Sequence, residues 1–338
     1  MKSGYRLILI LLLIGTRSFS QEVVLFQSQK PVNLRASGSV KSIKKNSNDS
    51  ILVAGKFEYE HGNEWITIPV KARVRGNFRL KNCYFPPLKV KFNKKEIAGT
   101  VFAGNKSLKL VLPCKTSADK NDLILKEYLC YQFYQTVSPY YFRTRLANLE
   151  LTETSRKKPK TYSLLTFFVE DNSLVAKRMG GVVSEVKGIN PTTFDEKQSV
   201  RNDYFQYMIG NADWSAVYQH NSNTLIVAGK YIPLSYDFDM AGFVNAAYAQ
   251  ANPTNLGTGD IRERVYRGFC KSVSVMEEVR KEFLEKEPAV LTIIDQHASS
   301  FENYEVKDMK NYLDGFFYIL KNDNQFKQSI LEQCRTNK

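Results

Sequence analysis

Hydrophobic and polar residues alternate along the first third of the chain in the manner of β-strands. Within residues 65–74, Ile, Val and Ala occupy every second position, and a period of two places one apolar face against a core. Similar runs, interrupted by polar turns, extend over residues 23–112. We therefore expect a β-sheet here, with the basic, Ser- and Asn-rich segment 40–49 as a solvated loop between strands.

A helix and two further strands are expected next. The apolar residues change to helical spacing over residues 119–136, and the candidate N-caps are Ser117, Asp119 and Asn121. Strand-like runs return at residues 142–151 and 162–169, separated by a basic turn. This helix is therefore expected to cross the sheet.

Helical spacing dominates the second half. Residues 194–209 carry an apolar stripe that ends at Gly210, a favourable residue just after a helix. Residues 224–227 and 231–234 predict a short hairpin, and nearly everything after residue 260 has a helical pattern. This order predicts an α+β protein of two lobes: a sheet-rich lobe over residues 21–172 and a helix-rich lobe over 173–338.

The first twenty residues are typical of a secretory signal peptide. Lys2 and Arg6 flank the start, residues 7–14 are an unbroken apolar run, and Ser18 and Ser20 supply small residues at the −3 and −1 positions. The run is shorter than the ~20 residues of a permanent membrane-spanning helix. We expect export, to the periplasm or beyond, without a transmembrane anchor; an uncleaved helix or anchor is the alternative.

The composition is that of a globular chain with a basic charge. A hydrophobic content of 43% and a charged content of 24% exclude fibrous and disordered proteins. Removal of the leader, with its three basic residues, would reduce the formal charge from +14 to +11. Such a surface attracts anionic partners over about one Debye length, ~8 Å. Nucleic acid is not an expected partner, because no nucleic-acid-binding motif accompanies the charge.

The five cysteines, Cys83, Cys114, Cys130, Cys270 and Cys334, are an odd number, so at least one thiol stays free or pairs between chains. Cys83 and Cys114 follow predicted strands and could form one disulfide, although other pairings are open. All five could also be small buried apolar groups. There is no CxxC motif and the three histidines are scattered, so a zinc site is not expected.

Acids and amides concentrate in one part of the second half. They occur at residues 210–214 after a predicted helix, at 220–223 before the hairpin, and at 236–239 directly after it. Magnesium takes hard oxygen ligands, commonly one or two carboxylates together with substrate phosphates. A further carboxylate can orient the hydroxyl that attacks a phosphate. The segment therefore has the residue types of a magnesium-nucleotide site.

The order of these residues adds to this interpretation. In protein kinases a catalytic Asp is followed by an Asn ligand and then by a second metal-binding Asp; here Asp213, Asn221 or Asn223, and Asp237 or Asp239 occur in that order. Strand alternation would place residues 237 and 239 on one face, where two carboxylates repel unless a cation lies between them. Taken singly, each acid is also common in turns and helix caps.

Together the pieces resemble the CotH-type spore-coat kinases, an atypical branch of the protein-kinase-like fold, and more closely their secreted Bacteroidota relatives. The matching segments are residues 74–77 (VRGN), 85–92 (FPPLKVKF), a helix at 125–133, 211–214 (NADW) and 236–239 (YDFD). The resemblance implies a two-lobed fold, ATP and Mg²⁺ as cofactors, and transfer of phosphate to a protein hydroxyl.

The resemblance also implies roles for the acidic residues. Asp213 would be the base or the acid that orients the substrate, and Asn221 would be a second metal ligand. Asp237 or Asp239 would hold magnesium.

Phosphate binding would fall to basic residues of the first half. Lys91, or Lys89 near it, would contact the α- and β-phosphates, and Glu127 on the helix would pair with that lysine. There is no GxGxxG loop, so Arg75 and the backbone amides near Gly76 would replace it.

A second basic group follows at Arg262, Arg264 and Arg267. Guanidinium groups suit carboxylate and phosphate, so these residues could receive an acidic or phosphorylated substrate. Ion pairs with Glu263 and neighbouring acids are the equal alternative.

These patterns support two functions of different classes. The first is an exported CotH-like kinase acting on a protein substrate. The second is a catalytically inactive protein of the same fold that binds an anionic partner in the cell envelope. A hydrolase that uses paired carboxylates is also conceivable, but it would need a specific separation of the two carboxyl groups.

Overall fold

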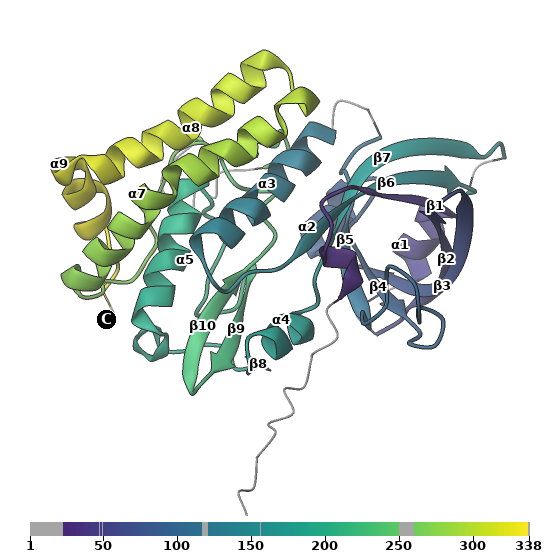
Figure 1. The fold of residues 1–338 in the computed structure, drawn as a ribbon, viewed down its shortest axis with the longest axis horizontal. Coiled ribbons are helices and arrows are strands. Elements are labelled where there is room, and N and C mark those ends of the chain that lie inside the picture. The colour runs from purple at the N-terminus through teal and green to yellow at the C-terminus, as the bar shows by residue number, and fades with distance from the viewer. Residues whose placement is uncertain are drawn as a thin grey trace, which may run out of the picture.

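The computed structural model describes residues 23–46, 48, 50–116, 121–155, 157–249 and 260–336. The predicted signal peptide, with its cleavage position after Ser20, lies outside the described residues, as do the candidate N-caps Ser117 and Asp119. Figure 1 shows a β-barrel at one side and a group of helices at the other, with helix α3 (Asn121–Val137) between them. No helix among the described residues combines the length and apolar character needed to cross a membrane.

Seven strands close into the barrel in the order β1-β2-β3-β4-β5-β7-β6. All neighbours are antiparallel except β1 and β6, which pair in parallel from Val32 with Ala147 to Gly38 with Glu153. This parallel pairing joins the two ends of the sheet. The strands are β1 (Val32–Gly38), β2 (Val53–His61), β3 (Glu64–Val74), β4 (Leu88–Phe92), β5 (Ser107–Val111), β6 (Thr144–Glu153) and β7 (Lys160–Val169).

The closed barrel shows that the predicted two-lobed, protein-kinase-like fold is wrong. The first half is not an open sheet crossed by one helix, because β1 and β6 close it and α3 runs outside it. Periodicity predicted individual strands, such as β3, but it contains no information on which distant strands pair. Pairing depends on contacts between segments far apart in the chain.

Three short helical segments also belong to this half: η1 (Val24–Phe26), α1 (Val40–Asn46) and α2 (Asn77–Asn82). The loop expected over residues 40–49 is therefore wrong for its first part. The backbone N–H of Val40 donates to the buried carboxylate of Glu153 at 2.9 Å. This contact from β6 satisfies one of the free N–H groups at the start of α1, and it could not be read from the local sequence.

The second half combines a small sheet with helices. Strands β8 (Gly181–Ser184), β9 (Ser222–Val227) and β10 (Lys230–Ser235) form an antiparallel sheet in the order β10-β9-β8, which confirms the predicted hairpin. The other elements are α4 (Asn172–Arg178), η3 (Pro191–Thr193), α5 (Glu196–Met208), α7 (Val273–Gln296), η4 (Ala298–Ser300), α8 (Asn303–Lys321), α9 (Asp323–Phe326) and η5 (Lys327–Leu331).

Two hydrophobic cores hold these elements together. One lies inside the barrel, and the other lies between the outer face of β5 to β7 and helices α3, α5, α7 and α8. Val111, Phe167 and Val169 point out of the barrel into this second core. The barrel and the helices are therefore joined by buried apolar contact, which stabilises in proportion to the area removed from water.

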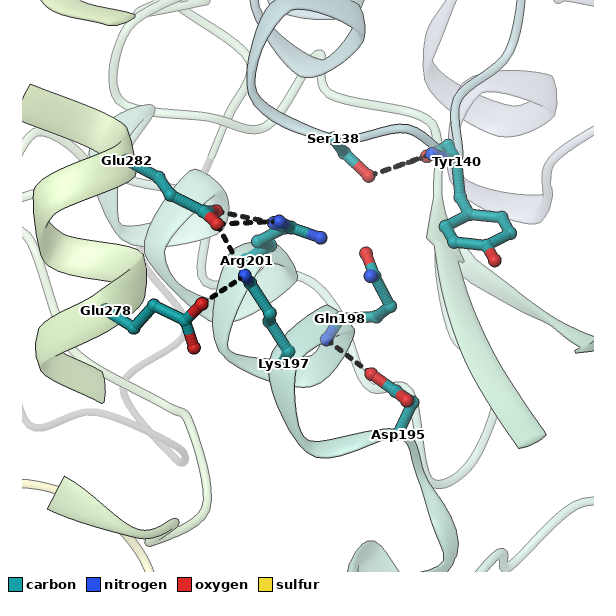
Figure 2. Close-up of polar contacts among 8 residues, drawn as sticks. All are labelled: Ser138, Tyr140, Asp195, Lys197, Gln198, Arg201, Glu278 and Glu282. Carbon is teal, nitrogen blue, oxygen red and sulfur yellow. Dashed lines mark hydrogen bonds and ion pairs between the residues drawn. The ribbon is translucent and has the colours of Figure 1, made fainter. Parts of the chain in front are cut away.

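Ion pairs fix α5 against α7, as Figure 2 shows. The ammonium group of Lys197 lies 2.6 Å from the carboxylate of Glu278 and 2.7 Å from that of Glu282. Arg201 forms a bidentate ion pair with Glu282, with both contacts at 2.8 Å. Asp195 caps the start of α5 by accepting from the backbone N–H of Gln198 at 3.0 Å. Helix α5 leads directly into the acidic segment, so these contacts help to set its position.

Two disulfides form, Cys83–Cys114 and Cys270–Cys334, and Cys130 is a free, buried thiol. The pairing of Cys83 with Cys114, open at the level of sequence, is thus present. It links the end of α2 to the segment that follows β5. In a chain-entropy account, a loop of 31 residues closed in this way stabilises by about 3 to 4 kcal/mol.

Candidate functional site

Three cationic side chains form a row across the outer face of the barrel. Arg73 on β3 pairs with Lys89 on β4, and Lys89 pairs with Lys109 on β5. Directly paired residues share a face of the sheet, and like charges so placed repel each other. The alternating residues Leu108 and Leu110 fill the barrel interior. The row therefore lies on the outside, where an anion would relieve the repulsion.

Lys109 is the buried member of this row, with 8% of its surface exposed. Its amine nitrogen lies 3.9 Å from the ring centre of Tyr236 and 4.4 Å from that of Phe142. It donates no hydrogen bond to any described residue. Burial lowers the pKa of Lys109 well below its usual value and Arg75 lowers it further, while Asp237 acts in the opposite direction. An anionic ligand would supply the missing acceptor.

Asp171 balances part of the charge of the row. Its carboxylate lies 3.7 Å from the ammonium group of Lys89 and accepts from the Ser107 hydroxyl at 2.5 Å. Burial alone would raise the pKa of Asp171, but the hydrogen bonds from Ser107 and Ser173 hold it below its usual value. Asp171 is therefore a carboxylate at neutral pH and orients Lys89.

Asp237 approaches Lys109 from the segment after β10. The strand ends at Ser235, and Asp237 has a φ of 66°, so the strand alternation invoked for residues 237 and 239 does not apply. Its N–H donates to the Tyr131 hydroxyl at 3.0 Å, whereas its carboxylate accepts no hydrogen bond from the described residues. A non-glycine residue with positive φ costs about 1 to 3 kcal/mol, and such residues cluster at functional sites.

A buried ionic cluster lies next to Asp237. The guanidinium of Arg79 on α2 is 3.8 Å from the carboxylate of Glu127 on α3 and 3.8 Å from that of Asp239. Arg79 also donates to the carbonyl of Leu112, and the Tyr248 hydroxyl donates to Asp239 at 3.1 Å. Exposures of 5% for Arg79, 2% for Glu127 and 5% for Asp239 show that all three side chains are buried. Both carboxylates therefore share one guanidinium.

This arrangement shifts the pKa values of all three groups. Burial raises the pKa of Glu127 well above its usual value, and the nearby Asp239 raises it further. Burial likewise raises the pKa of Asp239 to about 6. Burial alone would lower the pKa of Arg79, but the carboxylate of Asp239 raises it instead. The two acids therefore hold their protons more readily than usual beside a single guanidinium, and a further bound cation would favour their ionised forms.

Asp213 lies beside this cluster and is held by three neighbouring residues. Its carboxylate is 2.8 Å from His220 Nε2 and accepts from the side-chain amide of Asn221 at 2.9 Å. The same amide also donates to the backbone carbonyl of Asp213 at 2.8 Å. The backbone N–H of Asp213 donates to the side-chain oxygen of Asn211 at 3.0 Å. The side chain of Asp213 is 42% exposed. It is therefore both oriented and accessible.

The backbone around Asp213 is set by a close packing contact. Gly210 ends α5 with a φ of 63°, and a Cβ added there would lie 1.9 Å from the hydroxyl of Tyr312. Only glycine fits this position. Asn211, 2% exposed, donates to Gln206 at 2.9 Å, and Gln206 donates to Ser235 at 2.8 Å. This buried chain of hydrogen bonds fixes the start of the acidic segment to the end of β10.

Most of the predicted site residues are brought together. Electrostatic interactions connect Asp237 to Lys109 and to Arg79, and connect Asp213 to Asp239. Arg75 follows β3, with its guanidinium 5.9 Å from the ring centre of Tyr236. The cation row, the buried cluster and Asp213 therefore surround one region between the barrel and the helical part.

The predicted pair of Lys91 with Glu127 does not form. Lys91 is exposed on β4, paired with Lys71 across β3, while Glu127 lies against Arg79. Glu127 is 2% exposed, whereas a glutamate in a helix is usually exposed. The predicted pair is absent and Glu127 is buried for one reason, because α2, which the sequence did not predict, places Arg79 beside α3.

The described residues bring together few side chains that could bind a metal ion. The described part of the chain contains no group of three or more His, Cys, Asp or Glu side chains that could hold one. Magnesium, however, often uses one or two carboxylates and takes its other ligands from phosphate and water. The carboxylate of Asp237, with no hydrogen-bond donor among the described residues, fits that use.

The second basic group has structural contacts. Arg262 pairs with Asp308 at 2.7 Å. Arg264 stacks 3.8 Å over Tyr312 and donates to the carbonyl of Met208 at 3.2 Å. Arg267 donates to the carbonyl of Ala212, next to Asp213. Of the three, only Arg267 adjoins the site, and it does so by supporting the backbone.

The sequence interpretation missed Arg79, Lys109 and Asp171. A usable signal existed for Lys109, because it is a charged residue in the middle of the apolar run 107–112. A run of this kind is typical of a strand covered on both faces, and β5 is buried along its whole length. Arg79 and Asp171 have no comparable local signal.

No protein family model matches the chain, and a search of curated proteins gives no match. The resemblance to CotH-type kinases therefore stays a prediction from the motifs, and the function is argued from the geometry of the site.

Proposed function

We propose that the protein binds a nucleoside triphosphate with magnesium at this site and transfers its terminal phosphate to a hydroxyl of a protein substrate, as the CotH resemblance implied. One observation carries the proposal: the buried amine of Lys109 has no acceptor among the described residues and adjoins both Asp237 and further cations. A bound anion would accept a hydrogen bond from Lys109, and a cation held by the carboxylate of Asp237 would lie next to that anion. The chemistry would then operate on a barrel-based fold.

The phosphate groups would contact the outer face of the barrel. Lys109 and Lys89 point from adjacent strands to the same side, and Arg75 lies close enough to affect Lys109. Asp237, with Asn221 or Asp239 as a second ligand, would hold magnesium, which when bound neutralises charge on the phosphate oxygens.

Asp213 would accept the proton of the attacking hydroxyl. Its exposed carboxylate can be reached by a substrate, and its hydrogen bonds to His220 and Asn221 restrict its orientation. A carboxylate held in this way positions the nucleophile, which is the main contribution a protein makes to phosphoryl transfer.

Two disulfides support the expected export, since disulfides persist mainly in oxidising compartments. ATP is scarce there, which favours an alternative in which the same face binds an anionic envelope partner without catalysis. The exposed pair of Lys71 and Lys91, outside the site on the same barrel face, supports that alternative.

Calorimetric titration of Mg-ATP into the mature protein tests the proposal. The variants are Lys109→Met, Asp237→Asn and, as a matched control on the same barrel face, Lys91→Met. We expect binding to the unaltered protein and to Lys91→Met, and a loss of at least tenfold in affinity for Lys109→Met. Chelation of magnesium should weaken binding to the unaltered protein more than to Asp237→Asn.

Absence of binding at millimolar Mg-ATP, with every variant folded, would contradict the proposed function. Equal losses for Lys109→Met and Lys91→Met would show general charge attraction instead. That result would favour the anionic-partner alternative, to be tested with a linear polyanion and the Lys71→Ala and Lys91→Ala variants.

A further inference from the structure

The barrel interior is filled unequally along its length. At one end Tyr59, Phe92 and Phe168 surround Phe102, with ring centres 5.3 to 5.6 Å from it. Towards the other end the strands carry smaller residues, and a cavity of about 310 Å³ remains. The glycines and alanines that line it are Ala36, Gly38, Ala54, Gly55 and Ala72.

The cavity is mainly apolar, although Ser37, Ser39 and Ser42 also line it, and α1 forms one side of it. Its walls include Val70, Leu110 and Leu149, which point inward from three strands, and Val40 and Ile43 of α1. Figure 1 shows α1 within the ring of barrel strands. A volume of 310 Å³ corresponds to about ten water molecules at ~30 Å³ each, and small-molecule sites begin at about 300 Å³. Walls of this kind hold an apolar ligand better than water.

The two glycines preserve this space without a backbone reason. Neither Gly38 nor Gly55 has a positive φ. A Cβ added at Gly38 would meet nothing within 4 Å, and one at Gly55 would meet only a methyl group of Val70, at 3.9 Å. Glycine within a strand weakens it and often marks a site where a ligand approaches closely. Glycine at these two positions therefore lowers the stability of the strands, and a larger residue would not.

The surface beside the cavity is cationic. A neighbouring hollow shares Val40 with the cavity and is lined by Lys41, Lys44 and Lys45 of α1. The ammonium group of Lys44 donates one hydrogen bond, to the carbonyl of Cys83 at 2.8 Å. Helix α1 contains no acidic residue that would neutralise its lysines. An apolar space next to clustered lysines is complementary to a molecule with an apolar tail and an anionic head.

We propose that this half of the barrel binds a single acyl chain that ends in an anionic group, either carboxylate or phosphate. The chain would lie among the aliphatic side chains of the cavity, and the head group would contact Lys41 and Lys45. Closed barrels of about eight strands can hold one small ligand in this way. The site lies inside the barrel wall, whereas Lys109 lies outside it, so this proposal is independent of the proposed phosphotransfer.

The test measures binding of decanoate, decyl phosphate and decanol to the mature protein by calorimetry. We expect decanoate or decyl phosphate to bind, and whichever binds better identifies the head group. Ala72→Leu, which fills the cavity, should weaken that binding at least tenfold without lowering the melting temperature. Ala36→Leu provides a second filled variant in case the first does not fold.

The head group is tested separately. The Lys41→Ala/Lys45→Ala variant should weaken binding of the anionic ligand about fivefold or more and leave decanol unchanged. Lys95→Ala, an exposed lysine of the turn at the aromatic end, is the control and should change nothing. Failure of both anionic ligands to bind, undiminished binding to a folded filled variant, or equal binding to the lysine variant would overturn the proposal.

Discussion

Lys109 carries a cost that the fold alone does not explain. A buried amine without an acceptor destabilises a protein because it loses hydration and gains no compensating contact. Its contacts with Tyr236 and Phe142 offset part of this cost, since a cation is attracted to an aromatic face. Residues that weaken stability in this way are common where a protein binds or reacts, because selection retains them for activity.

We therefore expect Lys109→Met to raise the free energy of unfolding by about 1 to 3 kcal/mol at pH 7. The lowered pKa means that folded Lys109 binds fewer protons than unfolded Lys109 between its folded pKa and ~10.4. Stability of the unaltered protein should thus rise with pH across that window, and the variant should lack this contribution. Urea denaturation at pH 7 and pH 9 measures both effects.

The matched control for stability is Lys91→Met, which replaces an exposed lysine on the same barrel face. It should change the free energy of unfolding by less than about 0.5 kcal/mol. A Lys109→Met protein less stable than the unaltered one would show that the amine has a favourable partner.

Asp213 should affect catalysis and not binding. If it accepts the proton of the substrate hydroxyl, Asp213→Asn should lower the rate of phosphate transfer from ATP by about 10²- to 10⁴-fold. The affinity for Mg-ATP should stay within about threefold, because the proposed metal ligand is Asp237. Transfer from radiolabelled ATP, with calorimetry on the same sample, separates the two quantities; a variant with full activity would remove Asp213 from the proposed mechanism.

At the scale of single residues, the sequence predicted the acidic residues of the site better than its basic residues. Asp213, Asn221, Asp237 and Asp239 were selected from spacing, and the structure brings them near one another. Lys109 was missed because its burial depends on Tyr236, a residue contributed by the other half of the chain.

Among the elements, those with a strong local period were predictable. Strand β3, helix α5 and the β9–β10 hairpin agree with the pattern of their own residues. Barrel closure was not predictable, because it depends on the pairing of β1 with the distant β6. Helix α1 was missed for a similar reason, since its first N–H group is satisfied by Glu153.

Helix α2 connects a disulfide to the site. Cys83 follows its last residue and Cys114 follows β5, so the bond joins the two segments that meet at Arg79 and Leu112. Loss of the bond would allow α2 to move away from Leu112. The position of Arg79 against Glu127 and Asp239 would then be less fixed.

Replacing Cys83 and Cys114 together by Ala should lower the free energy of unfolding by about 3 to 4 kcal/mol and also weaken Mg-ATP binding. The matched control replaces Cys270 and Cys334, whose disulfide closes a separate loop that contains neither Arg79 nor Asp237. It should also reduce stability but leave the affinity unchanged. Thermal unfolding and calorimetry on both pairs measure this; equal affinity in the two variants would argue against a role of the disulfide in the site.

In the whole molecule, the site lies where the barrel and the helices share a core. Val111 and Val169 from the barrel pack in the same cluster as α3, α5 and α8. Glu127 on α3 and Arg79 on α2 bring one charge from each side of this contact. Protonation of the buried cluster should therefore change the stability of the complete fold and not that of a local loop.

The sign of this effect follows from the raised pKa values. Burial raises the pKa of Asp239 to about 6 and that of Glu127 above its usual value, so the folded state binds more protons than the unfolded state from pH ~4 upwards. Their contribution is most favourable at low pH and is lost as pH rises through the folded pKa values. Below pH ~4 both states are protonated, and the dependence disappears.

Glu127→Gln should therefore flatten the fall in stability between pH 5 and pH 8, by about 1 kcal/mol or more over that range. The amide keeps the size of the side chain and removes one of the two acids that share Arg79. Guanidinium-induced unfolding at several pH values, beside Glu263→Gln as a control outside the cluster, provides the measurement.

Magnesium with a nucleotide should reduce the same dependence in the unaltered protein, because a bound cation favours the ionised carboxylates. A parallel pH profile for Glu127→Gln and the unaltered protein would show that the buried carboxylates are already balanced by Arg79, which would remove the electrostatic reason for a cation at this site.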